Sequence, residues 1–297
     1  TREVIVSSGS INSPKLLELS GIGQPELLQK HGIDIVHELP GVGESLRDHY
    51  SPRMKYAISE KNATFSERGT GLRLIGEAMK YAFFRKGFIA LSTVPLRMYF
   101  RTREGLESPD ATISFMPFLT ERINRARVIS KQPGVTMNVN VLRSESLGSI
   151  HIKSADPAIA PAIRFNFLSA EMDRTGVLYA MRKGRELMET LPVAGIVSKE
   201  IAPGADLQSD EELLEWVRNN AETTYHPVGT CKMGSDPMSV VDDNLRVHGI
   251  DGLRVADASI MPTLTSGNTN APSIMIGEKC ATMVLAAAEA VDTKAAA

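Results

Sequence analysis

The hydrophobic pattern at the start of the chain predicts alternating strands and helices. Residues 3–7 form a short apolar run of the kind found in a buried strand, and a proline-initiated helix is predicted over residues 15–19. A second helix is predicted from Pro25 to Gly32, because glycine is suited to a left-handed C-cap. Residues 33–36 have the composition of another strand. Strands that run into helices in this way are typical of an α/β layer.

The middle of the chain has a different pattern. Over residues 135–141, Val and Met alternate with Thr and Asn, which predicts a strand with one packed face and one polar face. We therefore expect an antiparallel sheet with helices on one side. In the same region, further strands are predicted over residues 111–115 and 149–152. Helices are predicted over residues 72–85, 171–190 and 209–220.

The last quarter returns to glycine-punctuated turns and short strands, and it ends in a helix predicted over residues 273–290. The pattern thus combines α/β and α+β character. We expect residues 1–49 and 222–297 to form one domain, and residues 50–221 to form a second domain with an antiparallel sheet packed by helices.

Composition narrows the function classes. The chain has 297 residues and a formal net charge of −2, which gives no reason to expect nucleic acid as a partner. Cys231 and Cys280 are far apart in sequence, so we expect reduced, buried thiols and no metal site. The most apolar run, around residues 283–291, contains Glu289 and predicts no transmembrane segment. The first residues have a strand pattern with no signal peptide, as in a chain that begins in mid-domain.

Several familiar motifs are absent or incomplete. Gly21-x-Gly23 and Gly41-x-Gly43 resemble the start of a dinucleotide fingerprint, but Glu26 or Leu46 stands where the third glycine belongs. Both segments are better explained as turns. The chain also has no phosphate-binding loop, no Gly-x-Ser-x-Gly elbow and no His-Glu-x-x-His helix, so common phosphotransferases, hydrolases and zinc proteases lose their sequence support.

The strongest candidate for chemistry is His226. It precedes Pro227, which biases it toward an extended conformation on a rigid turn. A histidine with a pKa near neutrality, held in this way, is suited to take a proton from an alcohol. The alternative is that His226 only bonds nearby backbone groups within a packed turn.

A second candidate region precedes the last predicted helix. Pro272 lies near the start of this helix, and a helix start directs unpaired N–H groups and a positive dipole end toward an anion. A reduced flavin, negatively charged at its pyrimidine end, is one such anion. Asn268 and Asn270 lie just before this point, although caps and turns are the commonest use of asparagine.

Five segments together resemble the glucose-methanol-choline (GMC) oxidoreductase family. The first, residues 9–23, matches the second signature of that family residue for residue. The closing stretch of the chain most resembles bacterial choline dehydrogenases and primary-alcohol dehydrogenases. The middle region, residues 50–219, matches only weakly, as a variable substrate domain would. The segments are GSINSPKLLELSGIG, LPGVGESLRDH, HPVGTCKMG, VADASIMP and GNTNAPSIMIGEKCA.

The resemblance implies an FAD-dependent enzyme that oxidises a primary alcohol to an aldehyde. In this family, the alcohol proton passes to the histidine of the His-Pro motif, here His226, and the hydride passes to flavin N5. The second active-site position falls on Asn268, whose amide would donate to the developing alkoxide. Residues 1–49 and 222–297 would be parts of an FAD-binding Rossmann-like domain. Its expected cofactor contacts are Gly9, Ser10, Asp257, Ala258, Thr269 and Asn270.

The resemblance also sets what is expected of the whole molecule. The N-terminal dinucleotide motif of the family is not found here, so this chain alone is expected to bind FAD poorly and to be an inactive fragment. Ser45 stands where many members have asparagine, which weakens a cofactor role there. The electron acceptor would be a quinone or O2, and a hydroxynitrile lyase is the alternative activity. We expect a location in the cytoplasm or at the periphery of a membrane.

Overall fold

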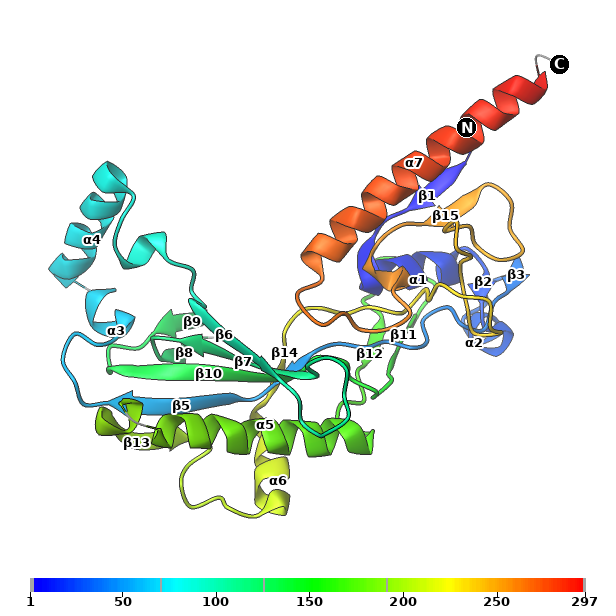
Figure 1. Ribbon diagram of the computed structural model, residues 1–297. Coiled ribbons are helices and arrows are strands. Elements are labelled where there is room, and N and C mark those ends of the chain that lie inside the picture. The colour runs from blue at the N-terminus through cyan, green and yellow to red at the C-terminus, as the bar shows by residue number, and fades with distance from the viewer. Residues whose placement is uncertain (1–2, 70, 125, 191, 296–297) are drawn as a thin grey trace. The chain divides into compact units, whose positions relative to one another are not determined.

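The computed structural model describes residues 3–69, 71–124, 126–190 and 192–295 (Figure 1). The chain forms two compact units. Unit 1 consists of Thr1–His49, Arg143–Ala170 and Thr224–Ala297, and unit 2 of Tyr50–Leu142 and Glu171–Thr223. Each unit contains helices and sheets, as the mixed fold class predicted.

The units differ from the expected domain division at residues 143–170, which the sequence pattern assigned to the middle domain. In the structure these residues belong to unit 1, because their backbone bonds to the loop that precedes His49. Leu46 and Gly148 exchange backbone hydrogen bonds of 3.0 and 2.8 Å, and the Ile150 N–H donates to the Gly43 carbonyl at 2.7 Å. The functions expected of the two domains stay predictions.

Unit 1 is built on a parallel strand pair, β1 with β15, which lies beside helix α1 and the long helix α7 (Figure 1). The strand predicted at residues 33–36 lies instead at His37–Glu38. The Ile33 N–H caps the preceding helix by donating to the Leu28 carbonyl. Gly32 has the expected left-handed φ of +67°. The elements of unit 1 are β1 (Val4–Val6), α1 (Gly9–Leu19), β2 (Ile22–Gly23), α2 (Pro25–Lys30), β3 (His37–Glu38), β11 (Ser149–His151), β12 (Ala162–Arg164), β15 (Leu253–Val255), the 3-10 turn η3 (Ala258–Ile260) and α7 (Asn270–Ala295).

Helix α1 begins earlier than predicted, with Pro14 inside it. A proline in a helix interior leaves the carbonyl four residues earlier without its usual donor, here that of Ser10. The Thr230 hydroxyl supplies this bond at 2.7 Å, and both residues are buried. A contact from more than 200 positions away thus allows the helix to run through Pro14 and back to Gly9.

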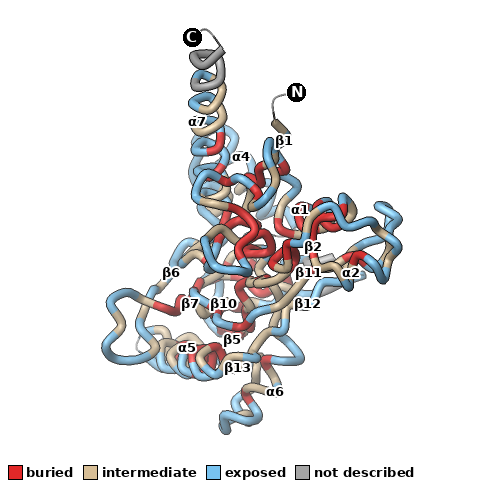
Figure 2. Tube along the Cα trace, turned by 90° about the vertical axis from the view of Figure 1, so that its right-hand side faces the viewer, coloured by how far each residue is buried: buried red, intermediate tan, exposed pale blue. Residues whose placement is uncertain are grey.

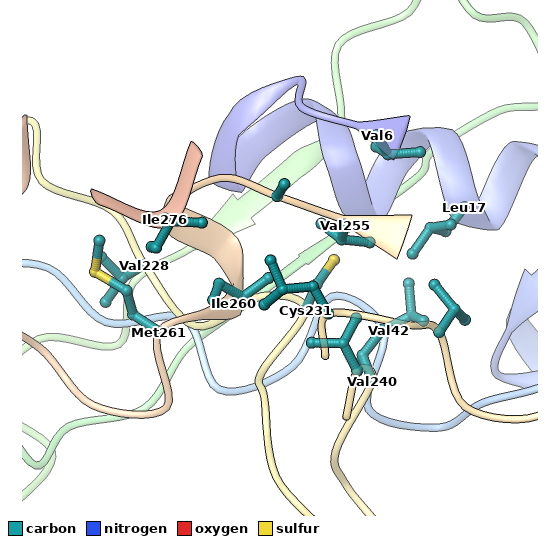
Figure 3. Packing of buried hydrophobic residues seen from close by; sticks show 14 of the residues in the cluster. Val6, Leu17, Val42, Val228, Cys231, Val240, Val255, Ile260, Met261 and Ile276 are labelled. Carbon is teal, nitrogen blue, oxygen red and sulfur yellow. The ribbon is translucent and has the colours of Figure 1, made fainter. Parts of the chain in front are cut away.

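The core of unit 1 gathers side chains from α1, β1, β15, η3 and the start of α7 (Figure 3). Val6, Leu17, Val255 and Ile276 are among its members. Both cysteines are free and buried, and burial raises the pKa of the Cys231 thiol far above its ordinary value. The expectation of reduced, buried thiols is thus confirmed.

Unit 2 contains the antiparallel sheet that the middle of the sequence predicted. Its strand order is β13-β5-β10-β7-β6, and α5 lies along one face (Figure 1). Buried and exposed positions adjoin along α5, as in an amphipathic helix (Figure 2). The elements of unit 2 are β4 (Tyr50–Ser51), β5 (Arg53–Ile58), α3 (Phe65–Arg68), α4 (Gly71–Phe84), η1 (Phe88–Ala90), β6 (Leu96–Phe100), β7 (Ala111–Met116), β8 (Thr120–Ile123), β9 (Ala126–Ile129), β10 (Gly134–Val141), α5 (Glu171–Glu189), η2 (Val193–Gly195), β13 (Val197–Ala202), α6 (Asp210–Asn220) and β14 (Glu222–Thr223).

The polar face predicted for β10 is not open to solvent. Thr136 and Asn140 on this face are buried. The Thr136 hydroxyl donates to the Phe118 carbonyl at 2.9 Å. At α6, Ser209 forms the expected cap, and with Glu212 it completes a capping box. Among the described helices, none is long and apolar enough to span a bilayer.

Candidate active site

His226 lies on a bulge between two backbone contacts. Arg47 and Val228 exchange backbone hydrogen bonds of 3.0 and 2.9 Å, and the Thr224 N–H donates to the His49 carbonyl at 3.0 Å. Three residues, 225–227, protrude between these contacts. Tyr225 adopts a left-handed φ of +64°, which costs about 1–2 kcal/mol for a residue with a Cβ. The His226 N–H donates to Oδ1 of Asp48 at 3.0 Å, so a buried carboxylate holds the bulge.

Both ring nitrogens of His226 have partners. Nδ1 lies 3.0 Å from Nδ1 of His49 and 2.9 Å from Oγ1 of Thr224. Nε2 lies 3.0 Å from the amide nitrogen of Asn268. His49 is buried and Asn268 is exposed, so Nδ1 faces the interior of unit 1 and Nε2 faces its surface. The structure therefore brings together the two residues to which the sequence assigned the chemistry.

Asn268 is held just before helix α7. The carbonyl of Thr269 accepts the Ser273 N–H at 3.0 Å and the Ser273 hydroxyl at 2.7 Å, which anchors the first turn. Thr269 is buried, whereas Asn270, the first residue of α7, is exposed. N–H groups of this first turn have no acceptor within the helix. The start of α7 thus places donors and a positive dipole end near the Asn268 carboxamide.

The other predicted contact residues lie at the start of α1. The Asp257 carboxylate accepts the Gly9 N–H at 2.9 Å and the Ser13 hydroxyl at 2.5 Å, and it caps the turn that begins at Ala258. The Ser10 hydroxyl donates to the Pro227 carbonyl at 2.6 Å. These bonds join the start of α1, the segment at Asp257 and the turn that carries His226.

Gly229 lets the segment HPVGTCKMG lie close to the segment LPGVGESLRDH. Gly229 has a φ of +91°, and a Cβ placed there would lie 2.3 Å from the Ser45 carbonyl oxygen. A larger residue is excluded both by the backbone conformation and by this contact. Ser45 itself has a left-handed φ of +61°, a conformation that asparagine tolerates well.

Sequence reasoning missed three residues that hold His226: Asp48 bonds to its backbone N–H, and His49 and Thr224 lie against its ring. The first two end the segment LPGVGESLRDH, which was recognised without a role for either side chain. The adjacent Asp48-His49 pair is a sequence signal for such a role, since carboxylates and polar rings often orient a catalytic histidine. Thr224 carries no comparable signal, because threonine is common in turns.

Comparison with known families matches both ends of the chain. A GMC oxidoreductase N-terminal model matches residues 1–51, and a GMC oxidoreductase C-terminal model matches residues 144–277, together more than half of the chain. The chain belongs to the GMC oxidoreductase family. The segment without a match, residues 52–143, lies almost entirely in unit 2 and contains most of its sheet.

The sequences of curated relatives align with nearly the whole length of this GMC chain. Oxygen-dependent choline dehydrogenase from Brucella canis is 40% identical over 289 residues, which cover 96% of this chain and 52% of the relative. The protein of the same name from Escherichia coli is 42% identical over 284 residues, or 95% of this chain and 50% of the relative. The chain thus spans about half the length of the curated relatives it matches.

A solved structure has the same fold. The structure of formate oxidase from Aspergillus oryzae, from work on the effect of a mutation on FAD modification, superimposes on this chain with a TM-score of 0.85. The two sequences are 26% identical. The match covers 96% of this chain and 54% of that chain.

Proposed function

We propose that this chain supplies the proton-accepting side of an FAD-dependent alcohol oxidoreductase, with His226 as base and Asn268 as its partner. One observation carries the proposal: the Asn268 amide nitrogen lies 3.0 Å from Nε2 of His226, while the opposite ring nitrogen bonds to groups on the interior side. A base needs its lone pair on the side from which the substrate comes.

The hydrogen bonds favour the tautomer that a base requires. An amide nitrogen can only donate, so Nε2 of His226 accepts and carries the lone pair. The proton of the neutral ring is then on Nδ1, where Thr224 and His49 lie within hydrogen-bonding distance. When an alcohol hydroxyl approaches Nε2, its proton passes to that nitrogen. The Asn268 amide then donates to the oxygen on which negative charge develops.

The residues at the start of α1 and α7 fit FAD. Gly9 has a left-handed φ of +78°, and no heavy atom lies within 4 Å of the place a Cβ would take, so a ligand can approach its backbone closely. The side chain of Ser10 and the carboxylate of Asp257 bond within the protein, which favours contacts through backbone N–H groups at these positions. Thr269 and Asn270 lie at the positive end of α7, which suits an anionic flavin. FAD, when bound, supplies the acceptor for the α-hydride of the alcohol.

The substrate class that we propose is a primary alcohol, choline-like or aliphatic or aromatic. Support comes from relatives named for choline at about 40% identity. Either O2 or a quinone would reoxidise the flavin, because the proton-accepting residues do not depend on the final acceptor.

Anaerobic mixing of the full-length, FAD-loaded enzyme with choline, a long-chain primary alcohol and a benzylic alcohol tests this function. We expect at least one alcohol to bleach the flavin absorbance and to yield its aldehyde. Peroxide formed on readmission of O2 would identify an oxidase. Cleavage of a cyanohydrin, with the flavin oxidised throughout and no alcohol bleaching it, would contradict the proposal in favour of a lyase.

A further inference from the structure

A second histidine lies directly behind the proposed base. Nδ1 of His49 is 3.0 Å from Nδ1 of His226, with the ring planes at 88° and the ring centroids 5.3 Å apart. His49 is only 3% exposed, so it forms the inner member of the pair. Two imidazole nitrogens at this distance share one proton, because two lone pairs repel each other and two N–H groups collide.

We propose that His49 is a positioning residue that accepts the Nδ1 proton of His226 and thereby keeps the lone pair of His226 on Nε2. This inference rests on the proposed function. It follows from the direction of the bonds: Asn268 donates to Nε2, so Nδ1 of the neutral ring carries the proton, and Nδ1 of His49 receives it. His49 then holds its own proton on Nε2.

Thr224 shares this role without replacing His49. Its hydroxyl lies 3.3 Å from the His49 carbonyl and donates to it, so its oxygen accepts from Nδ1 of His226 at 2.9 Å. A hydroxyl can orient the ring but cannot take up positive charge. A second imidazole can, because its ring nitrogen can bind a further proton.

The contact with His49 matters most once His226 has taken up the alcohol proton. During oxidation, the O–H bond of the alcohol breaks and an N–H bond forms at Nε2 of His226. The α C–H bond breaks, its hydride leaves with both electrons to FAD, and the carbonyl double bond forms. His226 then holds a proton on each nitrogen, and the Nδ1 proton in the bond to His49 spreads the positive charge over two rings. His49 touches no reacting atom and acts through His226.

Two substitutions of His49 separate this role from simple packing. His49→Phe keeps a planar ring but removes the acceptor, whereas His49→Asn places a carboxamide oxygen close to the former Nδ1. We expect His49→Phe to lower the limiting rate of flavin reduction about 10- to 100-fold, the scale known for losing the hydrogen-bond partner of a metal-bound histidine. Its Kd for the alcohol should change little. His49→Asn should recover most of the rate, which a loss of packing alone would not allow.

Nitrogen-15 NMR of histidine-labelled, FAD-loaded enzyme gives a readout independent of turnover. We expect the parent to hold the His226 proton on Nδ1 and His49→Phe to move part of it to Nε2. A parent in which His226 is protonated on Nε2 would overturn the proposal, whether or not the variants fold. A normal rate in His49→Phe, together with an inactive His226→Ala, would also overturn it and leave the proposed function intact. A normal rate in His226→Ala would instead refute the proposed function.

Discussion

The carboxamide nitrogen of Asn268 lies 3.0 Å from Nε2 of His226, although 42 positions separate the two residues in the chain. The two side chains come from different elements: a bulged turn held by Asp48 and the residue pair that precedes α7. Their meeting therefore depends on how unit 1 packs. The arrangement gives a basic nitrogen and an amide donor to the same small region, which is what removal of a hydroxyl proton requires.

Replacing Asn268 tests the amide donor. We expect Asn268→Ala to cost about 1.5–3 kcal/mol of transition-state stabilisation, the range for a hydrogen bond to a charged group. This corresponds to a flavin-reduction rate roughly 10- to 150-fold lower. Asn244→Ala, a substitution in an exposed turn, is the matched control and should leave the rate unchanged. Equal rates in Asn268→Ala and the parent would remove this amide from the mechanism.

A partly buried charge cluster in unit 1 makes stability depend on pH. His151 donates from Nδ1 to Glu18 at 2.6 Å and from Nε2 to Glu44 at 3.1 Å. Burial lowers the pKa of His151, but the bonds and charges of the two glutamates outweigh it and raise the pKa to about 9. The folded state thus binds the His151 proton more tightly than the unfolded state does. This contribution is fully present below the unfolded pKa of 6.5 and is lost as the pH rises through about 9.

At low pH, the change in stability comes from Glu44. Its hydrogen bond with His151 lowers its pKa, against burial, so its contribution is present above the ordinary value of 4.5 and is lost as the pH falls below it. Urea unfolding of the parent and His151→Gln across this range is the measurement. We expect the parent to lose stability between pH 6.5 and 9 and the variant to show a flatter curve there. Parallel curves would show that the cluster is not coupled to folding.

The hydroxyl of Thr230 is predicted to stabilise helix α1. Thr230→Val keeps the shape but leaves the Ser10 carbonyl without a donor, because Pro14 has no N–H to offer. A buried carbonyl left unpaired costs about 1–3 kcal/mol. Thermal or urea unfolding should detect this loss. Thr282→Val is the control, since the exposed Thr282 hydroxyl bonds to a Glu278 carbonyl that already takes a helix N–H. A similar loss in both variants would contradict this account.

Sequence patterns predicted the antiparallel sheet, the α6 cap and the two residues to which we assign the proton transfer, His226 and Asn268. Each of these depends on local spacing or on a recognisable segment. They failed where a distant contact decides the outcome. The start of α1 depends on the hydroxyl of Thr230, and the buried Thr136 on the polar face of β10 bonds to the Phe118 carbonyl, 18 positions away. His49 was missed for the same reason, since only folding places its Nδ1 beside His226.

The measurement that tests the central claim most directly is the rate of flavin reduction by alcohol in His226→Ala, followed by anaerobic rapid mixing of the full-length, FAD-loaded enzyme. Loss of a positioned base lowers such a rate by about 10²-fold or more. His31→Ala, at the C-terminal cap of α2, is the control and should behave as the parent does. A drop of that size in His226→Ala alone is the result we predict. A rate equal to that of the parent would contradict the assignment of His226 as the base.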